Sequence, residues 1–422
     1  MIEAGDAPSD VTNDAVLELL QRDQNRPDAD RYERQSLFQI PVHIDSNRHR
    51  SGAQTYLYAT RDNDAYPLTI RTNAFVNRVL FDESDASTSR PRASGVNYLE
   101  GEAMYSADRR YNSSYPGISH DVYATREVIV AGGVFNTPQI LKLSGIGPRE
   151  ELEEFGIPIL VDLPAVGRNM QDNYEAAVVV EASQPFETNF EECTPFEDGD
   201  PCLEQWHNNS SDHGPYGQGA AAVSMIMRSS LSENENADLF FFGGAGGAFR
   251  GHYPGFSHEA WPPETFFWTV VKMQSQNYAG TVRLRSSNPR DVPEISFNSF
   301  AQGREHDLNA MVEGFEFARR ALSRPGQEYG PYEWIQPTPN VTDHESISNE
   351  LYSHHATSTC IMGRADDENA CVDPQFRVRG VDNLRVVDGS VFPRVPGAFP
   401  VLPTFMLSEK ATDDILAAAC EG

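Results

Sequence analysis

The stretches that decide how this sequence is interpreted are YSHHATSTCIMG at residues 352–363 and LRVVDGSVFPRVPGAFPVLPT at residues 384–404. They combine paired histidines, an apolar run that ends in Asp388-Gly389, and a loop rich in proline and glycine. A chemical site needs an ionisable group, backbone that can approach a ligand closely, and rigid elements that hold both. We therefore expect the functional site of the chain to lie here.

A second segment has the order strand, glycine turn, helix. Residues 122–131 (VYATREVIVA) end in an apolar run typical of a buried parallel strand, and Gly132-Gly133 follow it. Asn136 and Pro138 are a suitable cap residue and first helical residue for a helix that ends near Ser144. This order places backbone N–H groups beside a bound group, although a simple strand–helix corner is an equally good interpretation of the residues alone.

These segments resemble the glucose–methanol–choline (GMC) flavoprotein oxidoreductases. Residues 355–362 are similar to the family segment H-x-x-G-T-C-x-M, and residues 388–391 (DGSV) match its D-[AG]-S-[VI]. Residues 132–148 (GGVFNTPQILKLSGIGP) resemble the second family signature, G-A-x-x-[ST]-P-x-x-[LIVM]-[LIVM]-x-x-S-G-[LIVM]-G. Residues 163–172 (LPAVGRNMQD) resemble L-P-G-V-G-x-N-L-Q-D. The resemblance as a whole extends from about Gln35 to the end of the sequence.

The resemblance implies an FAD-dependent alcohol oxidase or dehydrogenase that passes electrons to oxygen or a quinone. His355 maps onto the general base that takes the hydroxyl proton, while His354 packs or hydrogen-bonds elsewhere. The implied FAD contacts are the adenine at main-chain groups of Val76 or Val79, the pyrophosphate and ribityl chain at Asp388 and Gly389, and the flavin ring at Pro400 and Val401. Ala131 and Gly132 are expected to be further cofactor-binding residues.

The sequence departs from the family pattern at the second catalytic position. The family has His or Asn in the loop before the last helix, and the corresponding residue here is Phe399. Phenylalanine can neither donate a hydrogen bond nor accept a proton. Either His355 acts with a water or another side chain, or the chain resembles the non-redox lyase and cyclase members of the family.

The second departure concerns the N-terminal part. The G-x-G-x-x-G unit that holds the ADP moiety of FAD does not occur in the sequence, which opens MIEAGDAPSDVT. We therefore expect a fragment with an incomplete FAD-binding domain, which binds FAD poorly. Three hypotheses remain: an oxidoreductase, a non-redox family member, and an inactive remnant.

The expected fold class is α/β plus α+β, with an incomplete Rossmann-like FAD-binding domain and an antiparallel-sheet substrate domain. Residues 174–280 favour the antiparallel sheet because short apolar strands such as EAAVVVEA alternate with long polar loops. The predicted domains are 1–173, the remaining FAD-binding part; 174–345, the substrate-binding part; and 346–422, the return into the FAD domain.

Composition limits the partners. A formal net charge of −29 over 422 residues, with no basic stripe, argues against nucleic acid. No apolar run approaches the roughly 20 residues of a membrane span, and the first twenty residues do not resemble a signal peptide. His43 and His49 lack the further ligands of a metal site, so no metal is expected.

The five cysteines provide a weak indication of compartment. Cys193 and Cys202 flank an acidic loop at a spacing that suits a local disulfide. Cys360 is expected to be buried and free rather than paired with Cys371, and Cys420 is expected to be free. The disulfide and four glycosylation sequons favour a secreted glycoprotein; the sequons are at Asn112, Asn208, Asn209 and Asn340.

Overall fold

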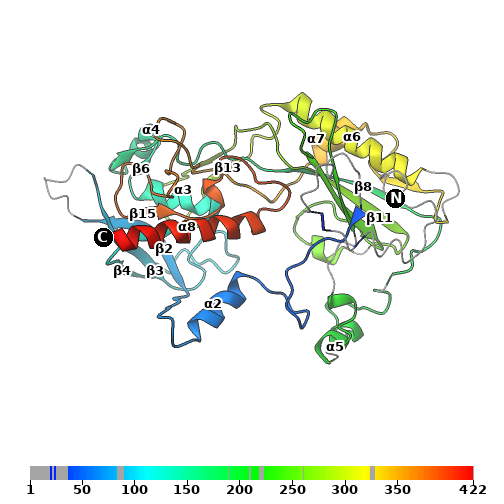
Figure 1. Cartoon of the computed structure of the whole chain (residues 1–422), viewed down its shortest axis with the longest axis horizontal. Coiled ribbons are helices and arrows are strands. Elements are labelled where there is room, and N and C mark those ends of the chain that lie inside the picture. Colours follow the sequence, from blue (N-terminus) through cyan, green and yellow to red (C-terminus); the bar gives the residue numbers. More distant parts are fainter. Residues whose placement is uncertain are drawn as a thin grey trace. The chain divides into compact units, whose positions relative to one another are not determined.

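The structure, a computed structural model, describes residues 20, 23–24, 37–82, 90–188, 190–208, 211–217, 223–259, 261–323 and 328–421. These residues form two compact units (Figure 1). Unit 1 takes the described residues within 1–70, 174–272 and 305–352, and unit 2 takes those within 71–173, 273–304 and 353–422. Each unit is thus assembled from three separate stretches of chain. The sequon at Asn209 lies outside the described residues.

Unit 1 is built on a six-stranded antiparallel sheet with the strand order β1-β9-β10-β11-β8-β14. β8 supplies the run YEAAVVVE, which is buried along nearly its whole length, so the sheet is covered on both faces there. This confirms the predicted antiparallel architecture. The strands of this sheet are β1 (Leu37–Phe38), β8 (Tyr174–Glu181), β9 (Val223–Met227), β10 (Leu239–Ala245), β11 (Thr265–Lys272) and β14 (Glu333–Gln336).

Helix α6 (Arg304–Leu322) lies along this sheet (Figure 1). Leu308, Met311 and Phe315 are buried at the three- and four-residue spacing of one helical face. At Gly314 a Cβ atom would lie 2.7 Å from a methyl carbon of Val270, so the glycine allows the helix backbone to approach the sheet. The other helices of unit 1 are α2 (Ala53–Arg61), α5 (Pro201–Asn208) and α7 (Asp343–Glu350), with the 3₁₀ turns η2 (Pro215–Gly217) and η3 (Phe256–His258).

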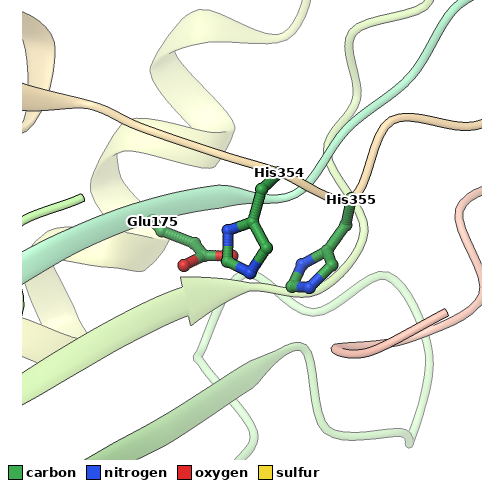
Figure 2. A group of neighbouring side chains, drawn as sticks. All are labelled: Glu175, His354 and His355. Atoms are coloured by element: carbon green, nitrogen blue, oxygen red, sulfur yellow. The ribbon is translucent and has the colours of Figure 1, made fainter. Parts of the chain in front are cut away.

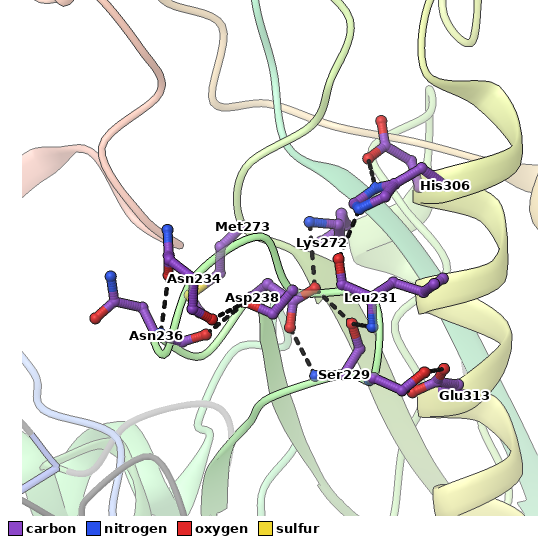
Figure 3. Close-up of polar contacts among 12 residues, drawn as sticks. Ser229, Leu231, Asn234, Asn236, Asp238, Lys272, Met273, His306 and Glu313 are labelled. Atoms are coloured by element: carbon purple, nitrogen blue, oxygen red, sulfur yellow. Dashed lines mark hydrogen bonds and ion pairs between the residues drawn. The ribbon is translucent and has the colours of Figure 1, made fainter.

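A buried polar cluster closes the connection between β9 and β10 (Figure 3). The backbone N–H and the hydroxyl of Ser229 each donate to the Asp238 carboxylate at 2.7 Å, and Lys272 Nζ lies 3.4 Å from the same carboxylate. A buried charge is tolerated only when it is paired and hydrogen-bonded. Asp238 meets both conditions, so the cluster is explained by the fold of unit 1.

Unit 2 contains a parallel strand pair, β5 and β15, and a three-stranded antiparallel sheet, β2-β3-β4. Helix α3 follows β5 directly, as in an α/β fold, and the predicted mixed fold class is confirmed. Its elements are β2 (Ala74–Phe81), β3 (Ala93–Glu100), β4 (Ile118–Tyr123), β5 (Val128–Val130), α3 (Gly133–Leu143), β6 (Ile146–Gly147), α4 (Arg149–Glu154), β7 (Val161–Asp162), β12 (Thr281–Arg283), β13 (Glu294–Ser296), β15 (Leu384–Val386), η4 (Gly389–Val391) and α8 (Val401–Glu421).

Two sequence expectations for this unit are wrong. The apolar run of β5 is not buried on both faces, because Val128 and Val130 are buried while Ile129 is 45% exposed. Helix α3 begins at Gly133, so Asn136 and Pro138 lie inside the helix and do not start it. Pairing of β5 with β15 and the glycine turn that follows it determine both features, and neither is visible in the local residue pattern.

The disulfides confirm one prediction and correct another. Cys193 is bonded to Cys202, and Cys420 is free and exposed, as expected. Cys360, however, is bonded to Cys371. The backbone N–H of Cys371 donates to the Ile361 carbonyl, and Met362 pairs with Val372, so two irregular segments run side by side and bring the sulfurs together.

Among the described residues, no helix combines the length and the apolar character needed to cross a bilayer.

Candidate active site

The two parallel strands of unit 2 end at the same edge. β5 and β15 pair in register from Leu384–Val128 to Val386–Val130, and the Val387 N–H extends the ladder to the Val130 carbonyl. Beyond this point β5 runs into Gly132-Gly133 and β15 runs into Asp388-Gly389. Because the carboxyl ends of parallel strands are the usual place for a bound cofactor, this edge is the candidate site.

Asp388 joins the two turns. One carboxylate oxygen, Oδ2, accepts hydrogen bonds from the Gly133 N–H at 2.9 Å and the Thr137 hydroxyl at 2.6 Å. The other oxygen, Oδ1, accepts from the Ser390 N–H at 2.8 Å. The carboxylate therefore lies at the N-terminus of α3, where the helix dipole favours a negative charge.

The two glycines of the turns serve different purposes. At Gly132 a Cβ atom would come within 3.2 Å of the N and Oγ1 atoms of Thr137, whose hydroxyl accepts the Gly132 N–H, so a larger residue here would have to displace Thr137 slightly. At Gly389 a Cβ atom would meet only Val134, at 3.5 Å. The space beside Gly389 thus permits close approach of a ligand to the backbone.

The histidine segment is attached to this edge by backbone hydrogen bonds. The N–H groups of Ser358, Cys360 and Met362 donate in turn to the carbonyls of Gly389, Ser390 and Val391. The predicted residues His355, Asp388 and Gly389 are thereby brought into one region of unit 2.

A proline inside α3 creates a further attachment. Pro138 has no N–H and cannot bond the carbonyl of Val134, four residues earlier, as the other helical residues do. The hydroxyl of Thr359 donates to that carbonyl instead, at 2.6 Å. Pro138 therefore leaves an acceptor in the helix that a side chain of the histidine segment fills.

His355 is buried and His354 is exposed. Figure 2 shows the two rings projecting to the same side of the chain, and their centroids are 3.9 Å apart. Glu175, which is also drawn there, belongs to unit 1. His355 is only 6% exposed. Burial lowers the pKa of its imidazole to about 4, although the nearby Asp172 carboxylate opposes this shift. The imidazole is thus neutral near pH 7, as a proton acceptor must be.

Phe399 contacts His355. The two rings meet edge to face with centroids 5.3 Å apart, and Phe399 is 39% exposed. The neighbouring predicted residues, Pro400 and Val401, lie at the start of α8, and the Pro400 carbonyl accepts the Thr404 N–H. The site therefore offers an apolar ring where the family pattern has a polar side chain.

Val79 lies away from the glycine turns, and Val76 is three residues before it on the chain. Both are on β2, and the Val79 N–H donates to the hydroxyl of Ser144, the C-terminal cap of α3. A helix of this length spans roughly 16 Å at 1.5 Å per residue, so Val79 is at the opposite end of α3 from Gly133. Its N–H is already used within the fold.

The sequence interpretation missed the role of Asp172. This residue is 6% exposed, and burial raises its pKa to about 6 against the opposing hydrogen bonds from Ser353 and His355. The signal was the run Gln171-Asp172-Asn173, three polar residues directly before a buried apolar strand. Three consecutive buried polar side chains indicate a hydrogen-bonded centre and not a linker.

The opposite pKa shifts of Asp172 and His355 predict opposing effects on stability. Lowering of the His355 pKa to about 4 makes stability rise with pH between about 4 and 6.5, because only the unfolded chain binds that proton. Raising of the Asp172 pKa to about 6 makes stability fall between about 4 and 6, because the folded chain keeps that proton. Each contribution amounts to about 3 kcal/mol.

We therefore expect the two variants to differ from the wild type in opposite directions. Relative to wild type, His355→Gln should lose stability as the pH rises from 4 to 6, and Asp172→Asn should gain it. The measurement is the free energy of unfolding in urea at several pH values from 4 to 7.5. Parallel curves for the wild type and both variants would contradict the shifts.

The fold and the site define an α/β protein. Two parallel strands end in glycine turns, as they do at many cofactor sites, and a buried histidine is attached to this edge. Family models described as GMC oxidoreductase match residues 14–175 and 276–408, which together are more than half of the chain. The chain belongs to the GMC oxidoreductase family, as predicted, and the cofactor of this family is FAD.

Curated relatives include choline dehydrogenases. The chain is 29% identical over 386 residues to an oxygen-dependent choline dehydrogenase of Pseudomonas syringae pv. tomato, covering 87% of this chain and 59% of that protein. It is 34% identical over 302 residues to the enzyme of the same name from Brucella canis, covering 70% and 52%. The chain thus spans between half and three fifths of the length of these two relatives.

Solved structures of similar fold include a formate oxidase of Aspergillus oryzae, whose FAD modification was studied. The TM-score is 0.73 and the sequence identity is 24%, and the match covers 91% of this chain and 66% of the oxidase chain. A fungal aryl-alcohol oxidase gives a TM-score of 0.68 and 22% identity, with 91% and 67% covered. At these identities the likeness shows the fold alone.

Proposed function

We propose that this chain carries the catalytic histidine and part of the FAD site of an oxidoreductase acting on CH–OH donors. The observation that carries the proposal is the attachment of the His355 segment to the Asp388-Gly389 turn through the hydrogen bonds of Ser358 and Cys360. These bonds hold the segment of the proton acceptor, His355, against the turn at Gly389, which has room for a ligand.

The residues present fit FAD at this edge. Gly389 leaves space for an approaching ligand, and Asp388 is a strong hydrogen-bond acceptor. Because a carboxylate repels phosphate, Asp388 suits the ribityl hydroxyl groups better than the pyrophosphate. Ala131 and Gly132 would face the same part of the cofactor, and Pro400 and Val401, next to Phe399, would lie by the ring. Of the two valines expected at the adenine, Val76 would be left for it, because the Val79 N–H already donates to Ser144.

In the proposed mechanism the chain supplies the base that accepts the hydroxyl proton of the substrate. Bound FAD would supply the acceptor for the two electrons that leave the substrate carbon with its hydrogen. A nitrogen of the His355 imidazole, neutral because burial lowers its pKa, takes the hydroxyl proton as the carbonyl forms. Phe399 covers one side of the imidazole and limits the access of water to it. Oxygen or a quinone would be the final electron acceptor.

Phe399 favours a second candidate, a non-redox lyase or cyclase of the same fold. The aromatic edge gives a substrate hydroxyl no hydrogen bond beside His355, so a reaction without alcohol oxidation remains a distinct proposal. Choline, formate and aryl alcohols are named for the relatives, and a small alcohol is the substrate class to test first.

The test is the visible spectrum of the purified 422-residue chain mixed with FAD, before and after anaerobic addition of an alcohol panel. The proposal predicts flavin bands that co-elute with the protein and lose absorbance with at least one alcohol. Bound flavin that no alcohol bleaches would favour the lyase or cyclase. A protein that retains no flavin would contradict both and support the inactive remnant.

We also propose an extracellular or otherwise oxidising setting, because the chain holds two disulfides. Asn112 and Asn340 are exposed and could carry glycans. Thiol labelling of the protein in its native host would contradict this setting if all four paired cysteines reacted without prior reduction.

A further inference from the structure

Asp172 makes several hydrogen bonds around His355. Its Oδ1 atom accepts the Ser353 hydroxyl, the backbone N–H of His355 at 2.9 Å and the backbone N–H of Asn173 at 2.8 Å. The Asp172 carbonyl accepts the Ser275 hydroxyl at 2.9 Å, which fixes the backbone from the other side. Asp172 is thus held through one carboxylate oxygen and through its own backbone carbonyl.

The flanking residues hold the other side of the site. The Gln171 side chain donates to the Pro393 carbonyl at 3.2 Å and accepts the Val395 N–H at 3.3 Å. The Asn173 side chain donates to the Gly397 carbonyl at 3.0 Å. These bonds fix the loop that leads to Phe399, while Asp172 fixes the segment that carries His355.

The backbone of the same tripeptide completes the arrangement. Gln171 and Thr357 pair reciprocally, with N–H to carbonyl distances of 3.2 Å and 2.9 Å. His355 is therefore held at its own N–H by Asp172 and two residues further on by Gln171. These bonds fix the backbone from which the imidazole projects.

We infer that Asp172 is a positioning residue for His355, fixing its backbone and keeping a carboxylate close to the residue that takes the proton. This inference rests on the proposed function and adds a residue to it. The second oxygen, Oδ2, is buried and has no hydrogen-bond partner among the described residues, so its charge is not neutralised by a donor there. A carboxylate in that state favours a cation nearby. Because the imidazole becomes cationic only during proton transfer, the effect belongs to the chemical step and not to substrate binding.

The kinetic test compares Asp172→Asn and Asp172→Ala with Asp373→Asn in the full chain loaded with FAD. Asp373 is a matched control, because its carboxylate also accepts two backbone N–H groups in unit 2, those of Gln375 and Arg377, at 2.9 Å each. Asp172→Asn should lower the rate of alcohol-dependent bleaching about 10- to 100-fold, with flavin content and KM within about twofold of wild type. Asp172→Ala should lower it further, and Asp373→Asn should leave it unchanged.

A second readout needs neither cofactor nor substrate. In histidine-labelled protein the amide resonance of His355, identified by its loss in His355→Gln, reports the hydrogen bond to Asp172. It should move in Asp172→Asn and Asp172→Ala and stay in place in Asp373→Asn. The Asn variant keeps the volume of the side chain, so a folded protein is expected, and circular dichroism checks it.

The two readouts separate the inference from the proposed function. An unmoved amide resonance, or a change in KM with an unchanged rate, would overturn the positioning role of Asp172. If the wild-type chain bleaches with no alcohol, the proposed function fails, and the amide resonance still decides whether Asp172 holds His355.

Discussion

His355→Gln should lower the rate of alcohol-dependent flavin bleaching by about 10²- to 10⁴-fold, the usual contribution of a general base. Glutamine fills a similar volume and can hydrogen-bond, but it cannot accept the proton. Flavin content should be unchanged, because the turn residues Asp388 and Gly389 remain intact. Stopped-flow absorbance under anaerobic conditions measures the step directly.

The adjacent histidine provides the control. His354 is exposed, whereas His355 is buried and contacts Phe399. His354→Gln should therefore bleach at a rate within a few-fold of wild type. A large loss in His354→Gln with little loss in His355→Gln would show that the base has been assigned to the wrong residue.

The pH profile adds a second check on His355. Its pKa is lowered to about 4, so the imidazole is neutral and active across most of the accessible range. In Asp172→Asn, which lacks the carboxylate that titrates near pH 6, the acid limb of kcat/KM should fall well below pH 6, and adding His355→Gln to this variant should remove it. An acid limb near the ordinary histidine value of about 6.5 would contradict the burial of the base.

Asp388→Ala should destabilise unit 2 by about 3 kcal/mol or more and abolish flavin retention. The substitution removes the acceptor of three donors: the Gly133 N–H, the Thr137 hydroxyl and the Ser390 N–H. A hydrogen bond to a charged group contributes about 1.5–3 kcal/mol, and buried donors without an acceptor pay their desolvation cost. Urea unfolding gives the loss of stability, and the spectrum after gel filtration gives flavin retention.

Graded variants test the reason for this effect. Asp388→Asn keeps one carbonyl oxygen, so it should lie between wild type and Asp388→Ala in both measurements. Asp382→Ala, at an exposed position shortly before it on the chain, should change stability by no more than about 0.5 kcal/mol. If Asp388→Ala were as stable as Asp382→Ala, the carboxylate would not be what joins the two turns.

The sequence by itself predicted the features that depend on neighbouring residues. The glycine turns at Gly132 and Gly389, the histidine segment, and the antiparallel strands of unit 1 each follow from a short run of residues. A glycine allows a close backbone approach wherever the chain later lies, and an alternating or apolar run indicates a strand without knowledge of its partner. The family motifs are local in the same sense, which is why membership was predicted correctly.

Tertiary structure decided which distant residues meet. Cys360 pairs with Cys371 because two irregular segments run side by side, and the sequence pattern favoured a free thiol. Helix α3 begins at Gly133 because the Asp388 carboxylate, 255 residues further on, accepts the first N–H, whereas Asn136 was the better cap residue in the local sequence.

The same distinction explains why Asp172 was missed. Its partners Ser353 and His355 are more than 180 positions away, so nothing within the motif LPAVGRNMQD indicates them. Residue type shows which hydrogen bonds a buried carboxylate can make, but only the folded chain determines which donors reach it. For this protein, sequence identified the histidine and the glycine turns, and the long-range hydrogen bonds of unit 2 determined how they are held together.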